Sequence, residues 1–323
     1  MTSPRKRGLF GLPTTVVIIV GVVLLGLLIL SVLVGPVGRG LLGKFGVTLT
    51  FPDWITVGQP HPHLAAPELF HIGGWPVTNT MIATWITCIF LIVVSALVTR
   101  RMKLIPGRLQ MVFEAILGWM YDFCVGIAGE KLARQVFPVV CTIFLFVLFN
   151  AYLSLVPGFG SILITVHGTE EELIRAANTD VNTTLAIAVV SVLYTLVMGI
   201  GAMGPGFFRQ YFNFGPFFRS LGQIFKGKFD LMAIFNGLIE IFVGLLEWLG
   251  FWIRVISFTF RLFGNMTAGE ILLLIIAFLV PWVVPTIFYG LELLIGFVQA
   301  LVFAGLTAVF TSLAVTPHEA ETE

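Results

Sequence analysis

Long runs of apolar residues dominate this chain, and the short segments between them carry most of its charge. About twenty consecutive apolar residues are needed to cross the hydrocarbon core of a bilayer. Four runs of that length predict membrane-spanning helices at 14–35, 78–99, about 136–156 and about 181–202. The run at 14–35 is long for the core of a removed leader peptide, so it favours a retained anchor, with a leader as the alternative.

The last third of the chain is apolar over a greater distance. Residues 231–280 contain no proline, and as one helix they would extend about 75 Å, more than twice the roughly 30 Å of hydrocarbon. Such a segment either turns back midway or lies steeply tilted. The prolines of VPWVVP interrupt it, and 286–315 is a second long apolar run. We therefore expect 231–315 to form one unit of two long helices.

The composition places most of the chain in a membrane. Hydrophobic residues make up 58% of its 323 residues and charged residues only 11%, whereas a soluble domain carries about a quarter charged residues. The sequence predicts an all-α, polytopic membrane protein with five or six hydrophobic segments. Its three cysteines lie far apart, and its five histidines fall in loops or the tail, so we expect no metal site, no cofactor and no disulfide framework.

Positive charge predicts how the chain crosses the membrane, because Lys and Arg collect on the cytoplasmic side. The basic residues of 1–13 place the N-terminus in the cytoplasm, and 36–77, poor in Lys and Arg, forms an external loop. Within the spans of 78–230, the basic run RRMK marks a return to the cytoplasm, where the mixed sequence of 107–135 predicts an amphipathic surface helix. Four more basic residues mark a second cytoplasmic loop: Arg209, Arg219, Lys226 and Lys228. The polar tail 316–323 is then cytoplasmic too, in a multi-pass protein of the cell inner (plasma) membrane.

Charged residues in the first long run follow one helical face. Four of them recur every seven residues and so lie on one slowly winding stripe: Glu240, Glu247, Arg254 and Arg261. Asn265 lies one turn further along the same stripe. Glu270 is nine residues beyond Arg261, which places it on the opposite side of an ideal helix. Arg261 and Glu270 are therefore expected to face different environments.

Two further polar positions stand out. In the second long run, Glu292 and Gln299 share a helical face with Gly296 between them, and a glycine there allows another helix to approach closely. Asp180 marks the outer end of the fourth predicted span. It is either a polar residue at the mouth of a pathway or the N-cap of that helix, beside Thr183 and Thr184.

Arg261 has no carboxylate within helical reach, since the residues three and four positions away are Ser257, Phe258, Gly264 and Asn265. A guanidinium stays protonated under ordinary conditions. Charges inside a membrane are costly and most often mark ion pathways. The alternative is an ion pair with Glu292 within the same chain.

One segment imitates a nucleotide-binding loop. GQIFKGKF, at 222–229, nearly matches the phosphate-binding pattern GxxxxGK[ST]. Phe229 replaces the hydroxyl residue that would hold magnesium, and no strand precedes the loop. We expect no nucleotide binding there.

Taken with its surroundings, RLFGNMTAGE (261–270) resembles the signature of subunit a of the F-type ATP synthase, the stator half of its proton channel. The resemblance extends over most of the chain from about Thr78, through blocks in the family's order: TNTMIATWI, MKLIPGRLQMVFEAILGWMYDF, FPVVCTIFLFVLFNAYLSLVPGF, DVNTTLAIAV and VQALVFAGLTAVF. The extra hydrophobic segment at 14–35 departs from the usual five crossings of the family. The family fold implies that 231–315 is a strongly tilted helical hairpin beside a ring of c subunits.

The resemblance also implies roles for individual residues. Arg261 matches the arginine that meets the ion-carrying carboxylate of the c-ring. The polar residues that match positions of the two aqueous half-channels are Asn265, Glu270 and Gln299, with Asp180 at the outer entrance and Glu247 at the cytoplasmic outlet. Glu292 stands where many relatives have a histidine or another acid. Because both Glu270 and Glu292 are acidic here, the order of proton transfer cannot be copied from the family.

The implied partners are the c-ring, b-type peripheral stalk subunits, the F1 sector, membrane lipid and protons, with no nucleic acid. The chain would not be catalytic by itself. H⁺ is the expected ion, although the ring largely decides between H⁺ and Na⁺. The leading alternative is an independent ion or anion transporter with an intramembrane arginine site, which predicts inverted repeats that this sequence does not clearly show. A purely structural anchor is a third possibility, but it leaves Arg261 and Glu292 unexplained.

Overall fold

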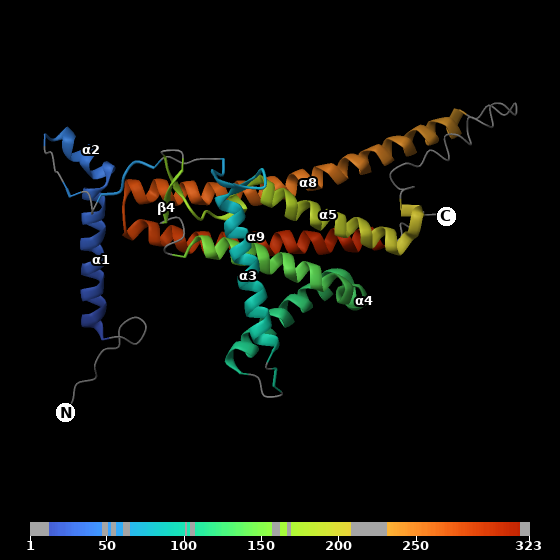
Figure 1. The fold of residues 1–323 in the computed structure, drawn as a ribbon, viewed down its shortest axis with the longest axis horizontal. Coiled ribbons are helices and arrows are strands. Elements are labelled where there is room, and N and C mark those ends of the chain that lie inside the picture. Colours follow the sequence, from blue (N-terminus) through green and yellow to red (C-terminus); the bar gives the residue numbers. More distant parts are fainter. Residues whose placement is uncertain are drawn as a thin grey trace. The chain divides into compact units, whose positions relative to one another are not determined.

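Helices make up most of the structure (Figure 1). This computed structural model describes residues 13–46, 51–52, 56–60, 65–100, 102–103, 107–156, 162–166, 169–207 and 231–316. Segment 222–229, the basic loop before residue 231 and nearly all of the tail lie outside the described residues. Six helices in the described part are long and apolar enough to cross a membrane, which confirms an all-α, polytopic membrane protein.

The chain forms two compact units. Unit 1 comprises 1–65 and 265–295, and unit 2 comprises 66–264 and 296–323. Unit 1 begins with α1 (Thr14–Val34) and the short α2 (Pro36–Lys44). Pro36 at the first position of α2 explains the break between them, because proline starts a helix well but cannot continue one.

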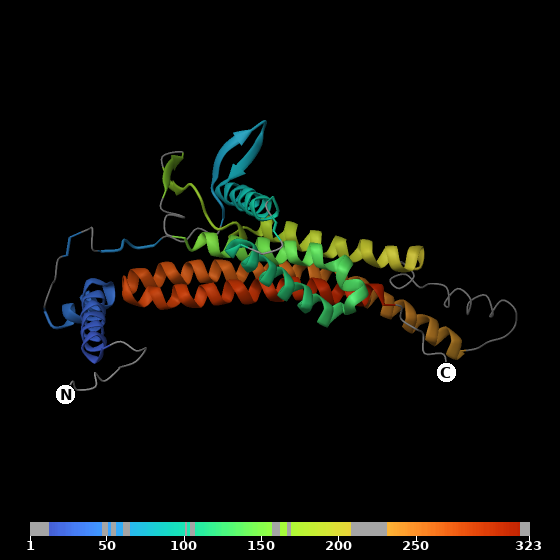
Figure 2. The ribbon, with the colours of Figure 1, turned by 90° about the horizontal axis from the view of Figure 1, so that it is seen from below.

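Unit 2 contains two β-hairpins beside its helices. Strands β1 (Glu68–Ile72) and β2 (Trp75–Thr78) are antiparallel and adjoin the start of α3 (Figure 2). Gly73 and Gly74 join them with φ of +58° and +89°, a conformation that favours glycine and matches the twist of a tight hairpin. Strands β4 (Leu163–Val166) and β5 (Thr169–Glu172) form the second hairpin. The sequence predicted only loops at both places.

Three helices form the body of unit 2 together with parts of the last two. These are α3 (Asn79–Thr99), α4 (Arg108–Ser154) and α5 (Val181–Met203), the last lying between the short turns η2 (Ala177–Thr179) and η3 (Gly204–Gly206). A kink interrupts α4 at Gly129, whose φ of +73° few other residues adopt. Large apolar side chains on the outer faces are exposed, among them Ile92 at 68%, as expected of surfaces that meet lipid.

The last two helices, α8 (Leu231–Leu279) and α9 (Val283–Val315), are both continuous. The long apolar segment therefore does not turn back midway. The helices run antiparallel: in unit 2 the ring of Phe258 lies 4.7 Å from that of Phe303, and in unit 1 Gly269 meets Glu292. Trp282 lies between the helices with an unusual φ of +72°.

Candidate functional site

Arg261 lies on the part of α8 that belongs to unit 2, with its side chain half-buried. Its Nη2 donates a hydrogen bond of 3.3 Å to the Oγ of Ser257, one turn earlier. In the part of unit 2 that the structure describes, Arg261 forms no ion pair. Because a hydroxyl is neutral, this long bond does not compensate the charge of the guanidinium.

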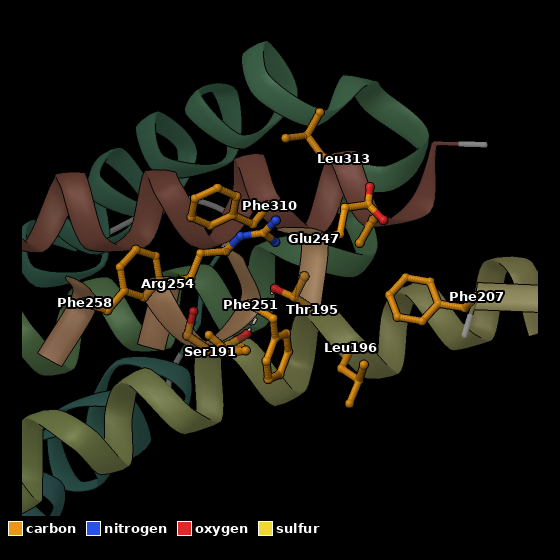
Figure 3. A pocket seen from close by; sticks show the side chains of 12 residues that line it. Ser191, Thr195, Leu196, Phe207, Glu247, Phe251, Arg254, Phe258, Phe310 and Leu313 are labelled. Carbon is orange, nitrogen blue, oxygen red and sulfur yellow. Dashed lines mark hydrogen bonds between the residues drawn. The ribbon is translucent and has the colours of Figure 1, made fainter. Parts of the chain in front are cut away.

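Glu247 and Arg254 border a cavity of about 240 Å³ in unit 2 (Figure 3). The guanidinium of Arg254 extends toward Glu247, and its central carbon lies 4.7 Å from the centre of the Phe310 ring (Figure 3). A cation over an aromatic face is attracted by the ring's quadrupole. The sequence predicted the shared helical face of these two residues, and the structure brings them to one cavity.

Hydroxyl groups line the α5 side of the same cavity. Ser191 and Thr195, one turn apart on α5, both face it. The Oγ of Ser191 lies 2.7 Å from the hydroxyl of Thr307, and that of Thr195 lies 3.1 Å from the hydroxyl of Thr311. The sequence interpretation did not single out these residues. The only available signal was the same spacing of four on both helices.

Asp180 occupies the other end of α5, where it is the N-cap. Its Oδ1 accepts a hydrogen bond of 2.9 Å from the backbone N–H of Asn182, which confirms the capping interpretation. Its Oδ2 accepts one of 2.8 Å from the hydroxyl of Thr80 on α3. Close by in the same unit, Asn178 accepts a bond of 3.3 Å from Asn150 of α4. The Asp180 carboxylate is therefore held by two hydrogen bonds, from Asn182 and from Thr80.

Glu292 is buried in unit 1, with 4% of its surface exposed. Its carboxylate lies directly against Gly269 of α8, where the Cβ of any other residue would overlap it. Glu270, half-buried, is the next residue along α8. The structure thus brings Glu292 to the segment that contains Glu270. The sequence interpretation did not single out Gly269, although this residue directly precedes Glu270.

The remaining predicted residues divide between the units. Asn265 belongs to unit 1 and is exposed. Gln299 belongs to unit 2 and is buried on α9, at 4% exposure. At Gly296, an added Cβ would lie 3.0 Å from the Cβ of Ala151 on α4. This confirms the predicted close approach of another helix.

Comparison with known proteins identifies the family of this chain. A family model described as ATP synthase A chain matches residues 81–312. The chain is 34% identical over 245 residues to ATP synthase subunit a of Gloeobacter violaceus, covering 75% of this chain and 85% of the relative. It is 30% identical over 234 residues to ATP synthase subunit a of Helicobacter pylori, covering 72% of this chain and 88% of that relative. The chain therefore belongs to the ATP synthase A chain family, as a proton-channel subunit of the membrane sector of F-type ATP synthase.

Proposed function

We propose that this chain carries protons past a rotating ring of c subunits through two half-channels. The residues proposed to act in proton translocation are Arg261, Glu270, Glu292, Gln299, Asn265, Asp180 and Glu247. The observation that supports this most strongly is Arg261, whose charge meets only a neutral hydroxyl in the described part of unit 2.

Arg261 would be neutralised by a carboxylate on a c subunit, exchanged as the ring turns. Each ring carboxylate loses its proton on the outlet side, passes Arg261 as an anion, and is reprotonated on the inlet side. Arginine suits this role because it does not release its own proton and so cannot relay protons directly between half-channels. Its charge also lowers the cost of an anion in the membrane.

On the inlet side, Asp180 would collect protons, and Glu270 and Glu292 would pass them on. Burial of Glu292 against Gly269 supports a fixed position for this carboxylate. Asn265 and Gln299 would bind water or orient the carboxylates through their amide groups.

On the outlet side, Glu247 would release protons to the cytoplasm. Residues Glu247 and Arg254 lie in the first half of α8, on the side of the loop whose basic residues predict a cytoplasmic position. We extend the proposal to the remaining predictions: cytoplasmic termini in the plasma membrane if 14–35 is retained, a surface helix at 107–135, and H⁺ as the ion. The partners would be the c-ring, b-type stalk subunits and F1.

Arg261→Ala tests the central role. In membrane vesicles that contain the whole complex, we expect ATP-driven proton pumping to be lost, while a passive leak through the membrane sector remains. Pumped protons would return through this leak, driven by about 2.3 kcal/mol per charge for each 100 mV of potential. No proton gradient would therefore build up. Arg261→Lys should fail as well, because a desolvated lysine can lose its proton.

A dye that reports the pH gradient measures pumping. Arg134→Ala is the matched control, since Arg134 is an exposed arginine of α4 paired with Glu130 at 3.2 Å. Its pumping should equal that of the unmodified complex. Tightly coupled pumping by Arg261→Ala would refute the proposed function.

A further inference from the structure

We infer that the cavity beside Glu247 and Arg254 holds water and is part of the proton outlet, with Ser191 and Thr195 as the residues that keep it hydrated. This inference rests on the proposed function and adds α5 to the walls of the outlet. It is carried by three features of unit 2: the size and charge of the cavity, the hydroxyl pairs on its wall, and its place along the helices.

The cavity is large and polar enough for water. Its volume of about 240 Å³ has room for several molecules, since one water takes roughly 30 Å³ in the liquid. A carboxylate, a guanidinium and two hydroxyl groups line it, from Glu247, Arg254, Ser191 and Thr195. A cavity stays empty when its walls are apolar, and it fills when several polar groups converge.

The pair of hydroxyl groups from Thr195 and Thr311 has more hydrogen-bond acceptors within reach than it has protons to donate. Thr311 can donate to the carbonyl of Thr307 at 2.7 Å, and Thr195 to the carbonyl of Ser191 at 3.1 Å. The two threonine hydroxyls also lie 3.1 Å from each other. Each hydroxyl has a single proton, so one of these three contacts always lacks one.

The second pair does not share this deficit. Thr307 donates to the carbonyl of Phe303 at 2.9 Å, which leaves the proton of Ser191 for the hydroxyl of Thr307 at 2.7 Å. The deficit therefore falls at Thr195 and Thr311. Of these two, Thr195 borders the cavity, where its hydroxyl oxygen can also accept a hydrogen bond from water.

The position of the cavity fits an outlet. Thr195 is about 22 Å from Asp180 along α5, at 1.5 Å per residue, and the cavity extends from the middle of α5 to Phe207 beyond its end. The cavity therefore lies on the side of α5 away from the proposed inlet. The cavity also contacts Phe310, Leu313 and Ala314 in the last turns of α9. Water between these helix ends would connect Glu247 with the side predicted to be cytoplasmic.

The alternative is that the hydroxyl pairs only hold α5 and α9 together, as Ser and Thr often do between membrane helices. A test must therefore measure water directly, apart from pumping. Val192→Cys places a thiol on the cavity wall, at a residue that is only 6% exposed, in a complex whose native cysteines are replaced by alanine. Its reaction with a small water-soluble thiol reagent, applied to the cytoplasmic face of inverted vesicles, reports access by water.

We expect the Val192→Cys thiol to react, and Thr195→Val to slow both this reaction and ATP-driven pumping by about tenfold, the effect of losing one hydrogen bond. Thr195→Ser should restore both. The control is Thr142→Val, because among the described residues the Thr142 hydroxyl bonds only to the Pro138 carbonyl of its own helix, at 2.7 Å. If Thr195→Val prevents assembly, Ala314→Phe fills the cavity from α9 and should give the same losses.

Three results would overturn the inference. An unreactive Val192→Cys would show a dry cavity. An unchanged reaction in the Thr195→Val complex would make the hydroxyl pairs purely structural. A hydrated cavity whose filling leaves pumping intact would exclude it from the outlet. None of these three results would contradict the proposed function. That function is tested separately, by the Arg261→Ala complex in the same vesicles.

Discussion

Arg254 and Arg261 lie seven residues apart on α8, but their charges are accommodated differently. The guanidinium of Arg254 lies over the Phe310 ring of the same chain, a contact worth about 0.5–2 kcal/mol depending on desolvation. Among the described residues of unit 2, Arg261 bonds only to the hydroxyl of Ser257. Of the two, Arg261 is thus the better candidate for a residue whose counter-ion comes from another protein.

At the residue scale too, the absence of a side chain at Gly269 allows the buried Glu292 carboxylate to lie where it does. Gly269→Ala should displace the Glu292 carboxylate, because the new Cβ would occupy the same space. We expect proton pumping to fall by about ten- to a hundredfold, as when a reacting group moves by about 1 Å.

The measurement is pumping by vesicles with equal amounts of assembled complex. Gly250→Ala on the same helix is the control, since nothing lies within 4 Å of a Cβ at Gly250. Normal pumping by Gly269→Ala would show that the exact place of Glu292 does not matter.

At the scale of elements, the long helices could be predicted from the sequence because each is specified by a local run of apolar residues. The apolar runs predicted α1, α3, α5, α8 and α9 to within a few residues, and the cap at Asp180 needed only its own neighbours. The contact between Thr195 and Thr311 spans 116 positions of sequence, so no local pattern reveals it. The hairpin at Gly73 and Gly74 was missed although its turn residues were visible.

Asp180 combines a cap with a proposed proton-collecting charge, and two substitutions separate them. Asp180→Ala should lower stability by about 1 kcal/mol through the lost cap. Asp180→Asn keeps a capping oxygen for the Asn182 N–H, and its NH₂ group can donate to the Thr80 hydroxyl, so stability should hold. Pumping by Asp180→Asn should still fall, by about tenfold, because a charge at a channel mouth raises the capture rate of ions.

Thermal unfolding of the complex measures the first effect, and the initial rate of acidification measures the second. If Asp180→Asn pumps at the full rate, Asp180 is a structural cap and should be removed from the inlet.

At the scale of the whole molecule, the chain is one subunit of an assembly. Affinity purification of the tagged full chain in mild detergent should bring with it a ring of small two-helix proteins and the ATPase subunits of F1. Mass spectrometry would identify them. Recovery of the chain alone, still able to transport an ion in vesicles, would favour an independent transporter.

The turn between α8 and α9 has a consequence for how deeply the protein sits in its bilayer. Trp282 holds a left-handed backbone conformation that costs about 1–2 kcal/mol for an L-residue and would cost glycine nothing. Indole rings prefer the level of the lipid headgroups. A bulky anchor retained at this strained corner would fix the depth in the bilayer of the two helix ends that meet there, both of which belong to unit 1.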